Sequence, residues 1–145
     1  VFWLHNFAYP DASSFTGCDA VVVPSDFSRE HYRHAIGLNC IALPPVVDLS
    51  RVVVDRPGGG KYLTYVNPIP EKGVFLFARI VAALGERRPD IPVLVVEGRG
   101  RADWLRRCGL NSANTTSVFR MPNTSDPRNF YHVSRLLIMP SVWQE

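Results

Sequence analysis

Short apolar runs alternate along this chain with segments whose apolar residues recur at helical spacing. Residues 92–96 form a continuous apolar run, which is typical of a strand buried on both faces of a parallel sheet. The segment before it carries one apolar helix face: Val74, Phe77, Ala78, Val81 and Leu84. Strands that alternate with helices are joined by right-handed crossovers, so the sequence predicts an α/β fold with a doubly wound, Rossmann-like parallel sheet.

The same patterns give the expected order of elements. Strands are expected at residues 1–4, 20–23, 40–43, 62–66, 92–96, 117–121 and 135–139. Helices are expected at residues 25–36, 74–84, 102–108 and 126–132. Ser25 is expected to cap the first helix and Gly37 to end it, and Asp126 with Pro127 is expected to open the last one.

A polar, glycine-rich segment interrupts this rhythm at Asp55-Arg56-Pro57-Gly58-Gly59-Gly60. Such a segment breaks regular structure and is typical of a linker. We therefore predict a first domain at residues 1–54, a linker at 55–60 and a second domain at 61–145. The chain starts with Val1 and has no signal-peptide layout, which predicts a fragment of a longer protein.

The cysteines limit the expected compartment, and the charge limits the classes of partner. The three cysteines are widely spaced and form no C-x-x-C pair, which predicts a reducing, cytoplasmic compartment. The net charge of +3 comes without a basic stripe interleaved with aromatic residues, so no nucleic-acid partner is expected. His31 and His34 lie three residues apart on an expected helix and are interpreted as a surface pair, so no metal site is expected.

Three loops follow strands, and ligands of doubly wound sheets bind at the carboxyl ends of strands. In the first loop, Lys72 and Gly73 stand at a helix start, where free N–H groups and the helix dipole favour a phosphate. A solvated first turn is the alternative interpretation of Lys72. The second loop, residues 97–101, fails the dinucleotide pattern, and its arginines are interpreted as a solvated face. The third loop, residues 140–145, ends in a carboxylate that could accept hydrogen bonds from sugar hydroxyls.

Taken in order, these segments resemble the group-1 (family 4) retaining glycosyltransferases, which have the two-domain GT-B fold. Residues 62–68 with Glu71-Lys72-Gly73 resemble the first strand and donor-phosphate loop of their C-terminal domain. Residues 129–131 and 136–141 with Glu145 resemble the approach to their paired-glutamate motif. Residues 3–5 and 19–25 resemble the last strands of their N-terminal domain, which is the acceptor side.

The resemblance implies a sugar transfer from a nucleotide-sugar donor to an unspecified acceptor, without cofactor or metal. Asn67, Lys72 and Gly73 would bind the donor, with Lys72 on the diphosphate. Glu145 would address the donor sugar, and His5 would face that sugar from the N-terminal domain. The resemblance also places the nucleobase beside the backbone of three residues: Phe119, Arg120 and Met121.

Two departures from the family pattern affect the expected activity. Asn67-Pro68 stands where members commonly carry Gly-Arg, so the arginine that assists the lysine is missing or moved. The second glutamate would lie beyond Glu145, so we expect the chain alone to be inactive and its parent to be the enzyme. A non-catalytic nucleotide-binding or interaction module and a sugar-nucleotide epimerase of the same fold stay as alternatives.

The position of the last expected strand gives two expectations about association. Residues 135–139 should lie beside residues 62–66 with an open edge, which is a template for pairing with another chain. We therefore expect the chain to self-associate. Peripheral association of the parent protein with a membrane is left open.

Overall fold

The computed structural model describes residues 1–55, 59–110 and 117–143. The chain divides into two compact units, residues 1–47 and residues 48–143, and each has its own parallel sheet. This confirms the predicted α/β class with Rossmann-like sheets. The predicted boundaries of 1–54, 55–60 and 61–145 stay a prediction, and residues 56–58 of the proposed linker lie outside the described residues.

The first unit contains a sheet in the order β1-β2-β3, with all pairs parallel. Its elements are β1 (Phe2–Trp3), η1 (Ala12–Phe15), β2 (Val21–Val23), α1 (Asp26–Ile36) and β3 (Ile41–Ala42). Leu4, Phe15, Val23 and Tyr32 form much of its buried core. The strands are shorter than the sequence predicted, because only a few residues in each pair with a neighbour.

Helix α1 begins and ends where its capping residues predicted. The Ser25 hydroxyl accepts the N–H of Ser28 at 3.1 Å, and Ser25 itself has extended backbone angles. Gly37 has a φ of 68°, which is the left-handed conformation that ends many helices. Both ends of this helix are therefore fixed by local interactions that the sequence alone specifies.

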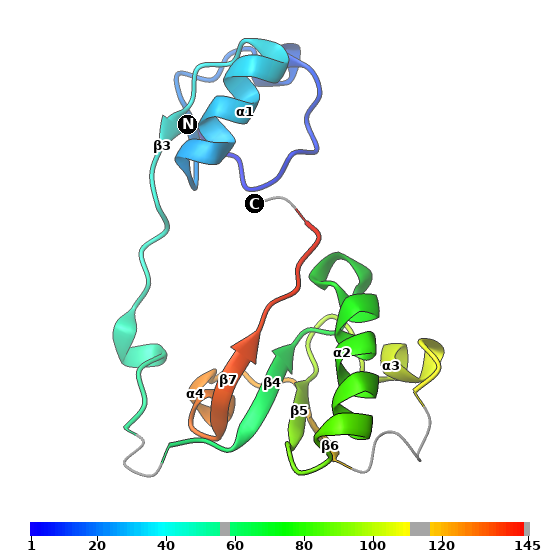
Figure 1. Cartoon of the computed structure of the whole chain (residues 1–145). Coiled ribbons are helices and arrows are strands. Elements are labelled where there is room, and N and C mark those ends of the chain that lie inside the picture. The colour runs from blue at the N-terminus through cyan, green and yellow to red at the C-terminus, as the bar shows by residue number, and fades with distance from the viewer. Residues whose placement is uncertain (56–58, 111–116, 144–145) are drawn as a thin grey trace. The chain divides into compact units, whose positions relative to one another are not determined.

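The second unit contains a parallel sheet in the order β6-β5-β4-β7 (Figure 1). Its strands are β4 (Tyr62–Val66), β5 (Val93–Val96), β6 (Val118–Met121) and β7 (Ser134–Ile138). Its helical elements are η2 (Leu49–Arg51), η3 (Pro70–Lys72), α2 (Val74–Arg87), α3 (Asp103–Arg107) and α4 (Arg128–Tyr131). The prediction that residues 62–66 are central and that β7 lies beside them is confirmed.

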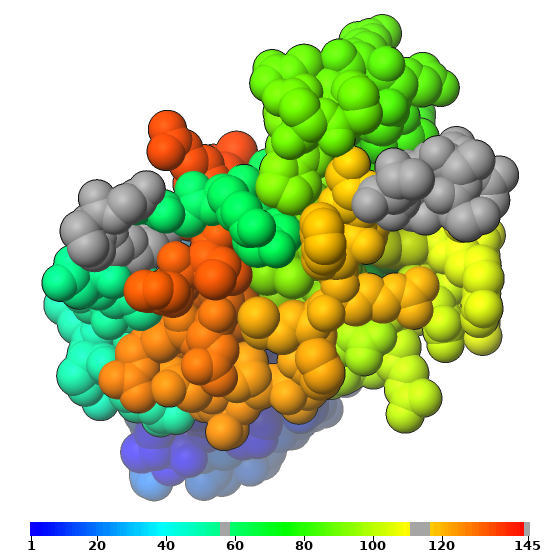
Figure 2. All heavy atoms as spheres, turned by 90° about the horizontal axis from the view of Figure 1, so that it is seen from below, coloured from blue at the N-terminus to red at the C-terminus, as the bar shows by residue number. Residues whose placement is uncertain are grey.

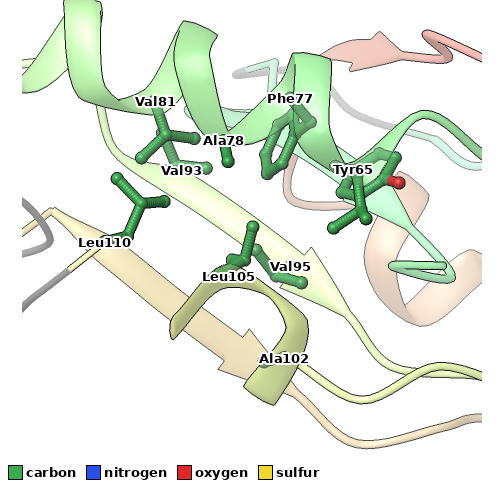
Figure 3. Close-up of a cluster of buried hydrophobic side chains, with 10 residues drawn as sticks. Tyr65, Phe77, Ala78, Val81, Val93, Val95, Ala102, Leu105 and Leu110 are labelled. Carbon is green, nitrogen blue, oxygen red and sulfur yellow. The ribbon is translucent and has the colours of Figure 1, made fainter. Parts of the chain in front are cut away.

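Helices α2 and α3 cover one face of this sheet, and the side chains between them form the larger core (Figure 3). The predicted apolar face of α2 is buried at Val74, Phe77, Ala78 and Val81, and Leu84 packs against it. The aromatic rings of Tyr65 and Phe77 stack with their centroids 4.1 Å apart. The core therefore lies directly under the loop that joins β4 to α2.

Helix α4 packs on the opposite face, where Phe130 contacts Leu94 and Val96 of β5. Successive residues of a strand point to opposite faces, so the unbroken apolar run of β5 supplies both cores. The segment around η2 lies beside α4, and Arg128 Nη1 contacts the carbonyl oxygen of Ser50 at 3.5 Å (Figure 2). Residues 48–55 thus belong to the C-terminal unit.

The start of α4 differs slightly from the prediction. Pro127 is the cap residue, not Asp126, and it has helical backbone angles. Asp126 still stabilises this end, because its carboxylate accepts the N–H of Arg128 at 3.1 Å and pairs with the Arg128 guanidinium at 2.8 Å. That guanidinium holds the pKa of the Asp126 carboxyl below its usual range.

Strand β7 is an edge strand of the described sheet, as predicted. A buried hydrogen bond joins it to β4, with the hydroxyls of Thr64 and Ser134 2.6 Å apart. Leu136 is 58% exposed, and the expected self-association through this edge stays a prediction. Among the described residues, no helix is long and apolar enough to cross a membrane.

Candidate functional site

The loop from β4 to α2 starts with a residue in a conformation that glycine usually adopts. Asn67 has a φ of 60°, and it is the sole non-glycine residue with positive φ in the described part of the chain. Asparagine tolerates the left-handed region better than most residues. Asn67 therefore supplies the turn geometry of a glycine and adds an amide side chain at the carboxyl end of the central strand.

Two hydrogen bonds hold the rest of this loop over the core. The buried Tyr65 hydroxyl donates to the carbonyl oxygen of Lys72 at 2.9 Å. Burial raises the pKa of Tyr65, so its hydroxyl stays protonated and able to donate. The N–H of Val142 donates to the carbonyl oxygen of Glu71 at 3.1 Å, which joins the loop to the segment after β7.

Helix α2 begins at Val74, as predicted, with Gly73 as its cap residue and Lys72 in the preceding turn η3. Gly73 has a φ of 77°, and no side chain caps the first N–H groups of α2. A Cβ atom on Gly73 would lie 1.8 Å from the carbonyl oxygen of Pro140. The helix start and the segment after β7 are therefore in close backbone contact, which only glycine permits.

A hollow of about 200 Å³ opens at this end of the sheet, between the β4 loop and the segment after β7. Asn67 and Lys72 are the amide and cationic groups in its wall. The remaining wall is mostly apolar: Tyr65, Val66, Phe130, Tyr131, Leu137, Ile138, Met139 and Ser141. Ligand sites commonly combine an apolar wall with a few convergent polar groups.

The structure brings some predicted site residues together and leaves others apart. Asn67 and Lys72 share the hollow, and Gly73 follows directly. Arg120 and Met121 end β6, on the far side of β5, where Met121 packs against the α4 core and Arg120 is exposed. All of them lie at or near the carboxyl ends of parallel strands.

The two residues predicted as catalytic fall outside the described part of the unit that contains this hollow. His5 lies in the unit of residues 1–47, just after β1, and its ring stacks on Trp3 with centroids 5.6 Å apart. Glu145 lies outside the described residues. Within the described residues, no cluster of three or more histidine, cysteine or acidic side chains could hold a metal.

Sequence reasoning missed the walls that α4 and β7 contribute to the hollow. Phe130 and Tyr131 come from α4, Leu137 comes from the end of β7, and Met139 follows that strand. The expected pairing of β7 with β4 could have indicated these walls. Helix α4 precedes β7 by only a short turn, so it must lie near that strand and near the end of β4. The family resemblance includes residues 129–131 and 136–141 only as the approach to the paired-glutamate motif, not as walls of a site.

Comparison with known proteins identifies the fold. No protein-family profile and no curated sequence matches the chain. Among solved structures, TarM superposes with a TM-score of 0.70 at 14% identity, over 86% of this chain. A glycosyltransferase from Rickettsia africae ESF-5 gives 0.61 at 17% identity over 90% of the chain. The chain has the Rossmann-like fold of the part of these GT-B glycosyltransferase structures that it covers.

Other neighbours with this fold carry nucleotide and sugar ligands. The pneumococcal O-GlcNAc transferase GtfA, solved in complex with UDP and GlcNAc, gives a TM-score of 0.57 at 17% identity over 79% of the chain. A mutant of S. aureus TarM was solved with fondaparinux, alpha-GlcNAc-glycerol and UDP. The chain spans 25% of TarM, 41% of the Rickettsia enzyme and 24% of GtfA.

Proposed function

We propose that this chain is part of a retaining glycosyltransferase, which transfers a sugar from a nucleotide-sugar donor to an acceptor. The unit of residues 48–143 binds the diphosphate of that donor. The observation that carries the proposal is the hollow at the carboxyl end of β4 and β7, with Lys72 in its wall just before the start of α2, which has no side-chain cap.

The start of α2 is suited to a phosphate for two physical reasons. The first N–H groups of a helix have no partner within the helix, and Gly73 provides no capping side chain. The carbonyl oxygen of Ile69 accepts the N–H of Val74 at 3.3 Å, so the phosphate would use the N–H groups that follow. The helix dipole places about half a positive charge at this end. Lys72 adds a full positive charge near the positive end of the helix dipole, where the two repel each other. A bound anion would offset this repulsion.

The ligands of the structural neighbours support a nucleotide-sugar donor. The TarM mutant contains UDP, and GtfA contains UDP and GlcNAc. Both proteins share the fold of this chain, whose hollow lies at the strand ends where doubly wound sheets bind nucleotides. A module that binds nucleotides without sugar transfer is less well supported, because the neighbours named as enzymes are transferases.

Each residue then has a defined role in the proposed reaction. Lys72 neutralises charge on the departing diphosphate, so the reaction needs no metal. The backbone at Arg120 and Met121 contacts the nucleobase at the end of β6. His5 and Glu145 address the donor sugar, and the acceptor binds mainly to the N-terminal side. The chain alone is inactive, because transfer requires both domains to close around the substrates.

The main test is the replacement of Lys72 by alanine in the protein that contains this chain. Loss of one charge-assisted contact to the diphosphate costs about 1.5–3 kcal/mol. We therefore expect kcat/KM for the nucleotide-sugar donor to fall roughly 10- to 150-fold, and affinity for UDP to fall by a similar factor. Steady-state kinetics and titration calorimetry measure the two effects.

Lys61 provides a matched control, because it is the only other lysine in the chain. It lies just before β4, at the opposite end of the strand, over the ring of Tyr62. The Lys61→Ala variant should keep the donor kinetics of the wild-type protein. Equal kinetics for Lys72→Ala and wild type would show that Lys72 is a solvated residue and that the phosphate site lies elsewhere.

NMR of the product's anomeric configuration tests retention.

A further inference from the structure

The loop after β5 presents a single arginine at the tip of a tight turn. The N–H of Gly98 donates to the carbonyl oxygen of Gly100 at 3.0 Å, which closes the turn around Arg99. The Glu97 carboxylate accepts the N–H of Ala102 at 2.9 Å and so fixes the chain on leaving the turn. Arg99 is exposed while Gly100 is buried, so the turn is anchored on one side and open on the other.

Asn67 connects this turn to the candidate site. Its side-chain oxygen accepts the N–H of Gly100 at 2.9 Å, across a sequence separation of 33 residues. The same residue lines the hollow that also contains Lys72. Since β4 and β5 are neighbouring parallel strands, their carboxyl-end loops meet at the same edge of the sheet. The hydrogen bond from Gly100 therefore places the turn at the rim of the hollow.

The contact between the two loops depends on glycine on either side of Arg99. A Cβ atom on Gly100 would lie 2.2 Å from the carbonyl oxygen of Pro68. A Cβ atom on Gly98 would lie 3.1 Å from the side-chain oxygen of Asn67. The glycines thus allow a close backbone approach, and the pattern Gly-Arg-Gly carries its one long side chain where the loop is exposed.

Unlike three arginines of this unit, Arg99 has no ion-pair partner among the described residues, a property that it shares with Arg101 and Arg120. Arg88, Arg106 and Arg128 each form an ion pair with a nearby aspartate. In residues 1–55, 59–110 and 117–143, the Arg99 side chain has no ion pair or hydrogen bond. A diphosphate carries more than one negative charge, and Lys72 supplies one positive charge. An unpaired guanidinium can donate two parallel hydrogen bonds to phosphate oxygens.

We infer that Arg99 is the second cation of the diphosphate site, and that Asn67 is a positioning residue that holds Arg99 there through Gly100. The inference rests on the proposed function, because it assigns a ligand to the same site. In this arrangement, Lys72 and Arg99 approach the diphosphate from neighbouring loops, and Asn67 lies between them at the end of β4.

The test measures, by titration calorimetry, the affinities of the wild-type protein and of three single variants for UDP and for uridine. Arg99→Ala should weaken UDP binding about tenfold or more, since a charge-assisted contact is lost, and leave uridine binding unchanged. Arg107→Ala is the matched control, because that guanidinium lies over the Trp104 ring on α3, and it should bind UDP like wild type. Asn67→Gly keeps the left-handed backbone but removes the acceptor for Gly100.

The double variant decides whether Asn67 acts through Arg99. If it does, adding Asn67→Gly to Arg99→Ala should weaken UDP binding no further, so that the two losses are not additive. Additive losses would overturn the positioning role. Wild-type affinity in Arg99→Ala, with normal UDP binding by the parent, would overturn the inference and leave the proposed function intact. Absence of UDP binding by wild type would overturn both.

Discussion

Replacing Phe77 with alanine is expected to lower the free energy of unfolding of the unit of residues 48–143 by about 3–5 kcal/mol. Phe77 is fully buried on α2, and its ring stacks on Tyr65 with centroids 4.1 Å apart. The truncation removes apolar contacts and leaves a cavity in a close-packed core (Figure 3). Urea unfolding followed by circular dichroism measures the change.

Phe75 is a matched control on the same helix, because it is the same residue type but 54% exposed. Its edge contact with Trp104, at 6.0 Å between centroids, is the main interaction that alanine would remove. Phe75→Ala should therefore cost about 1 kcal/mol or less. Equal destabilisation by the two variants would contradict the assignment of α2's buried face.

Replacing Gly73 with alanine is expected to damage both stability and donor binding. The residue has a φ of 77°, and the left-handed conformation alone costs about 1–2 kcal/mol for alanine. In addition, the new Cβ atom would meet the carbonyl oxygen of Pro140 at 1.8 Å, so the backbone after β7 must move. That segment includes Met139 and Ser141, which line the hollow, so we expect UDP affinity to fall roughly tenfold or more.

Gly109→Ala separates the two effects, because Gly109 lies in the same unit and also has a left-handed φ, of 84°. Among the described residues, no atom lies within 4 Å of the position that its Cβ would take. This variant should be destabilised only by the left-handed conformation of its alanine, and it should keep the UDP affinity of wild type. If Gly73→Ala behaves like Gly109→Ala in both measurements, the contact with Pro140 is not required for the site.

Local signals in the sequence determined most of the elements. Ser25 and Gly37 fixed the ends of α1, because a side-chain cap and a left-handed glycine act through neighbouring residues. The helical spacing of apolar residues predicted the buried face of α2, and the unbroken apolar run predicted a strand with two buried faces at β5. Such patterns depend on backbone geometry that repeats within a few residues.

Only the tertiary structure decided how distant segments combine into a site. The Gly100 N–H finds its acceptor on Asn67, and the Thr64 hydroxyl meets Ser134 across 70 residues of chain. The sequence patterns gave Lys72 and Gly73 a phosphate-binding helix start, yet they treated Arg99 as a solvated residue. Whether two loops touch depends on strand register and on the backbone approach that their glycines permit. Neither property is encoded in any local pattern, because both arise when the whole sheet packs.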